Sequence, residues 1–106
     1  MTQDIAPPDT CTSMTELRAA IDRLDARLVA MLALRQRYIE RAAILKNTRD
    51  AVRDEVRIED VVRHVQEEGV RAGLSPAIAE RVWRVLIEAS IAHEYQAFDA
   101  KMGARP

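Results

Sequence analysis

The chain has 106 residues, which fits one domain, because either half alone would bury too little apolar surface to be stable. Hydrophobic residues make up 48% of it and aromatic residues only 4%, with three Gly and four Pro, so an all-α fold is expected. The net charge of -1 comes from nearly balanced acids and bases, which excludes the broad one-signed field that attracts nucleic acid or an anionic membrane.

The start of the chain predicts a tail followed by a helix. Residues 1–12 show no hydrophobic period and contain Pro7 and Pro8, so we expect a flexible tail. Ser13 and Glu16 then have the Ser-x-x-Glu spacing of a capping box, in which two backbone donors at a helix start are satisfied. We therefore predict one helical domain over residues 13–102.

A long apolar seam follows the cap. From Leu17 to Leu45 the apolar positions recur in steps of four and three, with no Gly or Pro between them. The pattern predicts one helix about 50 Å long, whereas a compact globule of this chain length is only about 33 Å across. One compact monomer cannot cover such a seam, so we expect a symmetric homodimer.

Two further helices are predicted. Residues 47–53 interrupt the pattern with mostly polar side chains, after which valines resume a shorter helix that ends near Gly69 or Gly73. These valines are Val56, Val61, Val62 and Val65. Ser75 and Pro76 supply an N-cap and a first-turn proline for a third helix that runs to about Lys101.

The sequence also indicates a cellular location. Cys11 is the only cysteine and cannot form an internal disulfide, and residues 1–9 are acidic and lack the apolar core of a signal peptide. No segment approaches the roughly 20 apolar residues that a membrane span needs. We expect a soluble, cytoplasmic protein without membrane association.

Polar residues interrupt the apolar seams at a few positions. Arg35 lies on the first seam, and Lys46 follows on the same face about 16 Å further along the helix. In the third helix, Ser90 and Glu94 lie one turn apart on an apolar stripe. Each of these residues alone is more often structural, since Arg and Lys can extend their charges to solvent and Ser packs well at helix crossings. Together they predict a polar, cationic pocket in a helical dimer.

Other chemistries have less support. His64 and His93 have no second ligand at a recognised metal-binding spacing, and Cys11 lies in the tail without an ordered base. The sequence has no Gly-rich loop that could hold a phosphate. We therefore expect neither a metal site nor a cofactor.

Four short motifs carry a family resemblance. They are Glu-Leu-Arg-Ala-Ala-Ile-Asp-Arg-Leu-Asp at 16–25, Leu-Ala-Leu-Arg at 32–35, Lys46, and Val-Arg-Asp at 52–54 with Arg57. In these motifs the chain resembles the all-helical chorismate mutases over about residues 14–98. The spacing of the charged residues is far more specific than helix periodicity.

The resemblance implies three helices per chain in an intertwined homodimer with two equivalent sites. Each site would hold the dicarboxylate chorismate with Arg18 of one subunit and with Arg35, Lys46 and Arg57 of the other, while Ser90 helps to position the ligand. The helix geometry agrees, because Arg18 and Arg35 are 17 residues apart. That separation is about 25 Å along the axis, too far for one chain to grip a small ligand with both side chains.

The reaction implied is the pericyclic rearrangement of chorismate to prephenate in Phe and Tyr biosynthesis, which needs no nucleophile, metal or cofactor. Lys46 would donate to the ether oxygen, where negative charge develops. The second family donor is normally Gln, and Glu94 stands in its place. Only a protonated Glu94 can donate; burial favours that form, whereas neighbouring Arg and Lys favour the ionised form.

Two departures from the family pattern leave the substrate open. Ile58 stands where the best-known mutases have the Glu that binds the ring hydroxyl, and the segment from Lys46 to Arg57 is one residue shorter. Asp54 is an alternative partner for the hydroxyl, although the shorter segment leaves its register open. In both features the chain is similar to isochorismate pyruvate-lyase, a related enzyme of salicylate synthesis. This enzyme is the alternative prediction.

A third hypothesis is that the protein is not an enzyme but a non-catalytic helical dimer that binds an aromatic metabolite. The four cations at positions 18, 35, 46 and 57 argue against it, since a decayed site would be expected to lose some of this costly cluster.

Overall fold

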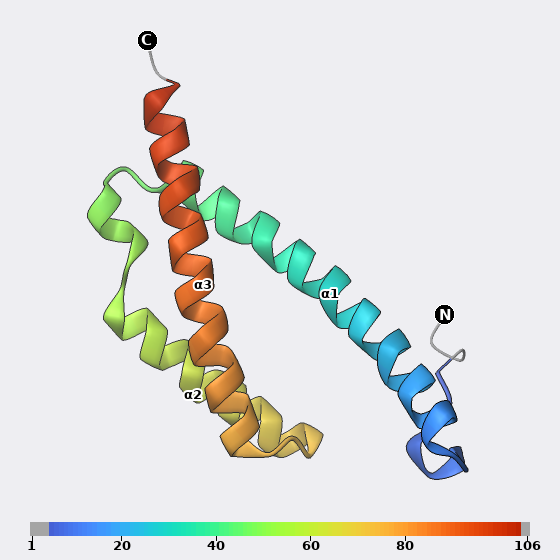
Figure 1. The fold of residues 1–106 in the computed structure, drawn as a ribbon. Coiled ribbons are helices and arrows are strands. Elements are labelled where there is room, and N and C mark those ends of the chain that lie inside the picture. Colours follow the sequence, from blue (N-terminus) through green and yellow to red (C-terminus); the bar gives the residue numbers. More distant parts are fainter. Residues whose placement is uncertain (1–4, 105–106) are drawn as a thin grey trace. The chain divides into compact units, whose positions relative to one another are not determined.

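The computed structural model describes residues 5–104 and contains three α-helices, which confirms the all-α prediction (Figure 1). They are α1 (Met14–Leu45), α2 (Glu55–Ala72) and α3 (Pro76–Gly103). Two short 3-10 helices, η1 (Pro8–Thr10) and η2 (Arg49–Val52), precede α1 and α2. No helix within residues 5–104 is long and apolar enough to cross a membrane. The chain forms two compact units, Met1–Arg37 and Tyr38–Pro106, so that α1 contributes to both.

The start of α1 confirms half of the predicted capping box. The Ser13 hydroxyl accepts a hydrogen bond from the backbone N–H of Glu16 at 3.1 Å. The Glu16 carboxylate accepts from the backbone N–H of Thr12, also at 3.1 Å, one residue before the position that the motif predicts. Residues 1–4 of the predicted tail lie outside the described residues, and its remainder includes η1.

Helices α2 and α3 form an antiparallel pair joined by a tight turn (Figure 1). Gly73 ends α2 with a φ of 81°, a left-handed conformation that glycine adopts without a steric penalty. Pro76 occupies the first turn of α3, as predicted. Ser75 is the N-cap residue, as predicted, although its side chain makes no capping hydrogen bond.

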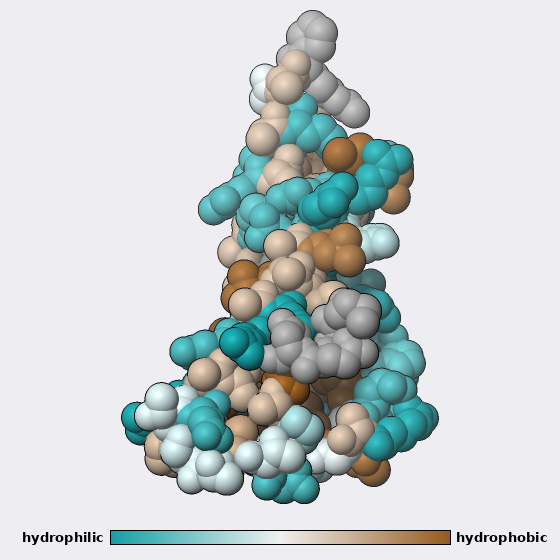
Figure 2. Space-filling view, turned by 90° about the vertical axis from the view of Figure 1, so that its right-hand side faces the viewer, coloured by the Kyte–Doolittle hydropathy of each residue, from teal (hydrophilic) through white to brown (hydrophobic). Residues whose placement is uncertain are grey.

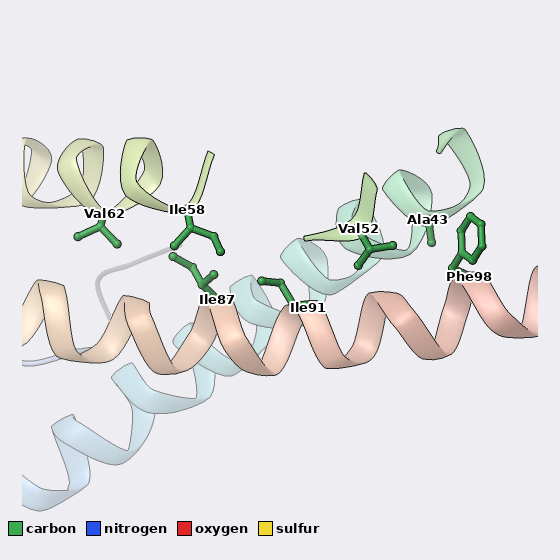
Figure 3. Packing of buried hydrophobic residues seen from close by; sticks show 7 residues of the cluster. All are labelled: Ala43, Val52, Ile58, Val62, Ile87, Ile91 and Phe98. Atoms are coloured by element: carbon green, nitrogen blue, oxygen red, sulfur yellow. The ribbon is translucent and has the colours of Figure 1, made fainter. Parts of the chain in front are cut away.

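The core of the second unit lies between α3 and the elements packed on it (Figure 3). Seven buried hydrophobic residues form it: Ala43, Val52, Ile58, Val62, Ile87, Ile91 and Phe98. The predicted stripe of α3 faces this core. In α2 the pattern was less accurate, because Val56 is exposed and Ile58 is buried instead. Val52 is also buried, although it lies in the segment that interrupts the helices.

Two bidentate ion pairs connect α3 to Arg53, which follows η2, and to Glu59 of α2. Arg53 donates to both carboxylate oxygens of Glu88 at 2.9 and 3.0 Å, and Arg84 donates to both oxygens of Glu59 at 3.0 and 3.1 Å. The hydrogen bonds from Arg53 lower the pKa of Glu88, and those from Arg84 lower the pKa of Glu59. Both pairs lie at the surface, so each contributes modestly to stability.

These pairs predict a loss of stability in acid. Because folding lowers both pKa values from 4.5, the two carboxylates stabilise the fold above that pH. Their contribution is lost as the pH falls below 4.5 through the folded-state values. Urea unfolding at a series of pH values should show a smaller acid loss for the double variant Glu59→Gln, Glu88→Gln than for the wild type. An equal loss in both proteins would show that these pairs do not govern the effect.

Candidate functional site

Lys46 and Glu94 form a largely enclosed ion pair. Lys46 directly follows the last residue of α1, and Glu94 lies in the middle of α3. The Nζ of Lys46 donates to Oε2 of Glu94 at 2.6 Å, with side chains that are 30% and 6% exposed. The Lys46 side chain is therefore partly reachable from solvent, whereas that of Glu94 is almost fully enclosed.

The position of Glu94 explains why it needs this partner. It shares the inward face of α3 with Ile87, Ile91 and Phe98, all of which are buried. An ionised carboxylate in such surroundings is costly unless a cation or several donors satisfy it. Lys46 supplies that cation, and an ammonium at the border of an apolar region can also donate to the oxygen of a bound ligand.

A second polar contact lies beside this pair. Nε2 of His93 is 2.7 Å from Oε2 of Glu40, so the last part of α1 and the middle of α3 are joined at two neighbouring positions. Sequence reasoning considered His93 only as a metal ligand and missed this contact. A Glu on one helix and a His on another, 53 residues apart, share no local spacing that would reveal it.

Asp54 and Arg57 come together at the start of α2. Asp54 is the N-cap residue, and its carboxylate accepts from the backbone N–H of Arg57 at 3.0 Å. The Arg57 guanidinium donates to Asp60 at 2.9 Å and is 65% exposed. Partial desolvation opposes the ionisation of Asp60, but the hydrogen bond from Arg57 and nearby cations lower its pKa overall. Arg57 is thus a surface cation with an exchangeable partner.

Ile58 lies in the core of the second unit. Its side chain points toward Ile87 of α3 and lies beside Val62 of its own helix (Figure 3). The position that carries an acid in the best-known mutases is therefore filled by an apolar side chain that stabilises the packing of α2 on α3.

The remaining predicted residues lie on α1 and α3. Ser90 is half-buried on α3, one turn before Glu94. Arg18 is exposed and Arg35 half-buried, and both belong to the part of α1 in the first unit. Their separation of 17 residues along one continuous helix corresponds to about 25 Å.

The structure also reveals a residue that sequence reasoning did not select. Lys101, in the last turn of α3, donates to the backbone carbonyls of Ala43, Ile44 and Lys46. The only sequence signal was a basic residue near the end of a helix, which is common and points to no particular contact. Within residues 5–104, no three His, Cys, Asp or Glu side chains gather closely enough to hold a metal ion.

The chain matches a known protein family. A family model described as chorismate mutase type II matches residues 17–95. This range contains every predicted site residue, and it confirms the resemblance drawn from the motifs. Among curated proteins, none matches the chain.

Proposed function

Because the chain belongs to the chorismate mutase type II family, we propose that it converts chorismate to prephenate, as a cytoplasmic isomerase of Phe and Tyr biosynthesis. The observation that carries the proposal is the pair of Lys46 and Glu94 within the matched range. The rearrangement breaks an ether C–O bond and forms a C–C bond within one molecule. An enzyme can accelerate it by holding the chair-like conformer and by stabilising charge on the ether oxygen.

Lys46 is the residue we assign to the ether oxygen. Its ammonium lies at the border of an apolar region, where a charge-assisted hydrogen bond is stronger than in bulk water. Glu94 is the second donor in this proposal and acts in its protonated form, in which it no longer pairs with Lys46 as a carboxylate. Its position 2.6 Å from Lys46 means that one small acceptor atom can contact both side chains.

The carboxylates of the substrate are assigned to arginines. Arg35 and Arg57 come from one subunit and Arg18 from its partner, while Ser90 contributes a hydrogen bond. The ion pair of Arg57 with Asp60 is solvent-exposed and worth little, so exchanging Asp60 for a substrate carboxylate costs little. An arginine can bind a carboxylate through two parallel hydrogen bonds, which orients the ligand as well as attracting it.

A second copy of the chain is part of this proposal. Ile21, Leu24, Leu28 and Met31 lie on one face of α1 and are 46–64% exposed in the single chain. Figure 2 shows apolar residues at the surface of one face of the molecule. An apolar stripe along a 32-residue helix is the kind of surface that a symmetric dimer buries.

Isochorismate pyruvate-lyase remains the second candidate, and the burial of Ile58 is the observation that favours it. No carboxylate at this position can meet the ring hydroxyl, and the carboxylate of Asp54 already caps α2. We still place the mutase first, because the family model names that activity and Asp54 keeps a second oxygen for a ligand.

Parallel steady-state kinetics decides between the candidates. Purified protein is assayed with chorismate for prephenate and with isochorismate for salicylate plus pyruvate. We expect kcat/KM for chorismate to exceed kcat/KM for isochorismate by at least about 100-fold. This ratio is a difference of about 2.7 kcal/mol in transition-state binding. A preference for isochorismate would make the enzyme a lyase. Inactivity with both substrates would favour the non-catalytic dimer that binds an aromatic metabolite.

The protonation of Glu94 predicts a pH profile. Only the protonated carboxyl can donate to the ether oxygen, so kcat/KM should fall as the pH rises. The variant Glu94→Gln carries a neutral donor at every pH and should show a flatter profile. Rates are measured across the range in which circular dichroism shows both proteins folded. Equal slopes in the two proteins would contradict the role of Glu94.

A further inference from the structure

Lys101 places its ammonium against three backbone carbonyls at the end of α1. Its Nζ donates to the carbonyl oxygens of Ala43 at 2.9 Å, Ile44 at 3.2 Å and Lys46 at 2.8 Å. A lysine ammonium has three N–H donors, so each of the three carbonyls receives one of them. All of these groups belong to the second compact unit.

The end of α1 needs such a donor. The last carbonyls of an α-helix have no partner inside the helix and carry the negative end of its dipole. The last turn of α1 contains no basic residue, so α3 provides the cation instead. The ring of Phe98 lies 4.5 Å from the Lys101 ammonium and close to Ala43, which fixes the last turns of α3 against α1 (Figure 3).

These contacts anchor the backbone of Lys46 on both sides. Its N–H donates to the carbonyl of Ala42 at 3.1 Å, and its own carbonyl accepts from Lys101. Lys46 is the first residue after α1, where helices commonly fray. When a ligand takes hydrogen bonds from its ammonium, the backbone anchors are what still determine where that ammonium lies.

We propose that Lys101 is a positioning residue for Lys46, an inference that rests on the proposed function. Lys101 acts through the backbone of Lys46 and contacts no substrate itself. It keeps the end of α1 from fraying and thereby holds Lys46, the donor to the ether oxygen, in place. A displacement of about 1 Å at a reacting centre can cost about 100-fold in rate, so even a partial shift should be measurable.

The kinetic test compares three variants. Lys101→Met removes the three donors and keeps an unbranched side chain, and it should lower kcat about tenfold with KM changed less than about twofold, because the charge on the ether oxygen develops in the transition state. Lys101→Arg keeps the charge but has a planar donor set, so an intermediate kcat is expected. Arg49→Met is the matched control, since Arg49 ties the neighbouring segment to Asp99 of α3; its kcat should stay within about twofold of wild type.

A second measurement reports on the anchor without relying on turnover. The chain contains two lysines, so ¹⁵N-lysine labelling gives two backbone amide signals, and the Lys101→Met variant retains only that of Lys46. Hydrogen exchange of this amide should be about tenfold faster in Lys101→Met than in the wild type or Arg49→Met. All rates are measured well below the melting temperature of each variant.

The outcomes separate the two claims. An active wild type together with an unchanged kcat in Lys101→Met, or with unchanged amide exchange, overturns the positioning role and leaves the proposed function intact. A kcat of Arg49→Met as low as that of Lys101→Met also overturns the positioning role, because loosening any neighbouring segment would then lower kcat equally. A wild type that is inactive with both chorismate and isochorismate overturns the proposed function itself.

Discussion

Replacing Lys46 with methionine is expected to lower kcat/KM for chorismate by about 100- to 1,000-fold, the usual loss when one donor to a developing negative charge is removed. The decrease should appear mainly in kcat, because the ether oxygen carries most of its charge in the transition state. Steady-state assays of purified wild type and variant measure it. A variant with more than about a third of the wild-type kcat would contradict the assigned role.

The same substitution also leaves the buried carboxylate of Glu94 without its cation, so a loss of stability must be separated from a loss of chemistry. The double variant Lys46→Met, Glu94→Gln removes the uncompensated charge and should recover most of the melting temperature. Its activity should stay low, because the ammonium is still absent. Recovery of activity along with stability would show that Lys46 serves the fold and not the reaction.

Replacing Leu28 with glutamate is expected to abolish the dimer at micromolar concentrations. Leu28 lies on the exposed apolar face of α1, and in a symmetric dimer the substitution places two charges in the buried seam. Each buried charge costs several kcal/mol, so dimerisation should weaken by about 1,000-fold or more. Sedimentation should give the mass of two chains for the wild type and a mass near 12.0 kDa for the variant.

The control for this variant uses the same helix and the same new side chain. Ala26 lies about 160° around α1 from Leu28, so Ala26→Glu adds a carboxylate away from the seam. This variant should sediment as a dimer and keep its activity. A monomeric wild type, or a dimeric and fully active Leu28→Glu, would show that the seam of α1 is not the interface.

The sequence predicted the helices well because their signals are local. Periodic apolar residues, the Ser13 cap, Gly73 and Pro76 each act within a few residues, and the structure shows α1, α2 and α3 near the expected limits. Contacts between distant segments were harder to predict. Val52 is buried because α3 packs against it, and Val56 is exposed because Ile58 faces that core instead. Neither outcome follows from the period of a single helix.

The candidate site shows the same division. The apolar stripe of α3 predicted that Glu94 faces inward, and the structure buries it against Lys46. The contacts of His93 with Glu40 and of Lys101 with the end of α1 depend on how separate helices meet, which no spacing in one segment encodes. The roles of Arg18 and Arg35 toward one ligand stay predictions, because they require a second chain.

The most direct test of the central claim, a site built from two chains, is complementation between inactive subunits. Arg18→Ala and Lys46→Met are purified separately, mixed in equal amounts, unfolded together and refolded. Random pairing makes half of the dimers heterodimers, and in each heterodimer one of the two sites combines the unmutated Arg18 of one chain with the unmutated Lys46 of the other. We expect recovery of about a quarter of the wild-type activity, from two proteins that are each nearly inactive. Activity that stays at the level of the separate variants would contradict it, because Arg18 would then serve the site of its own chain or none.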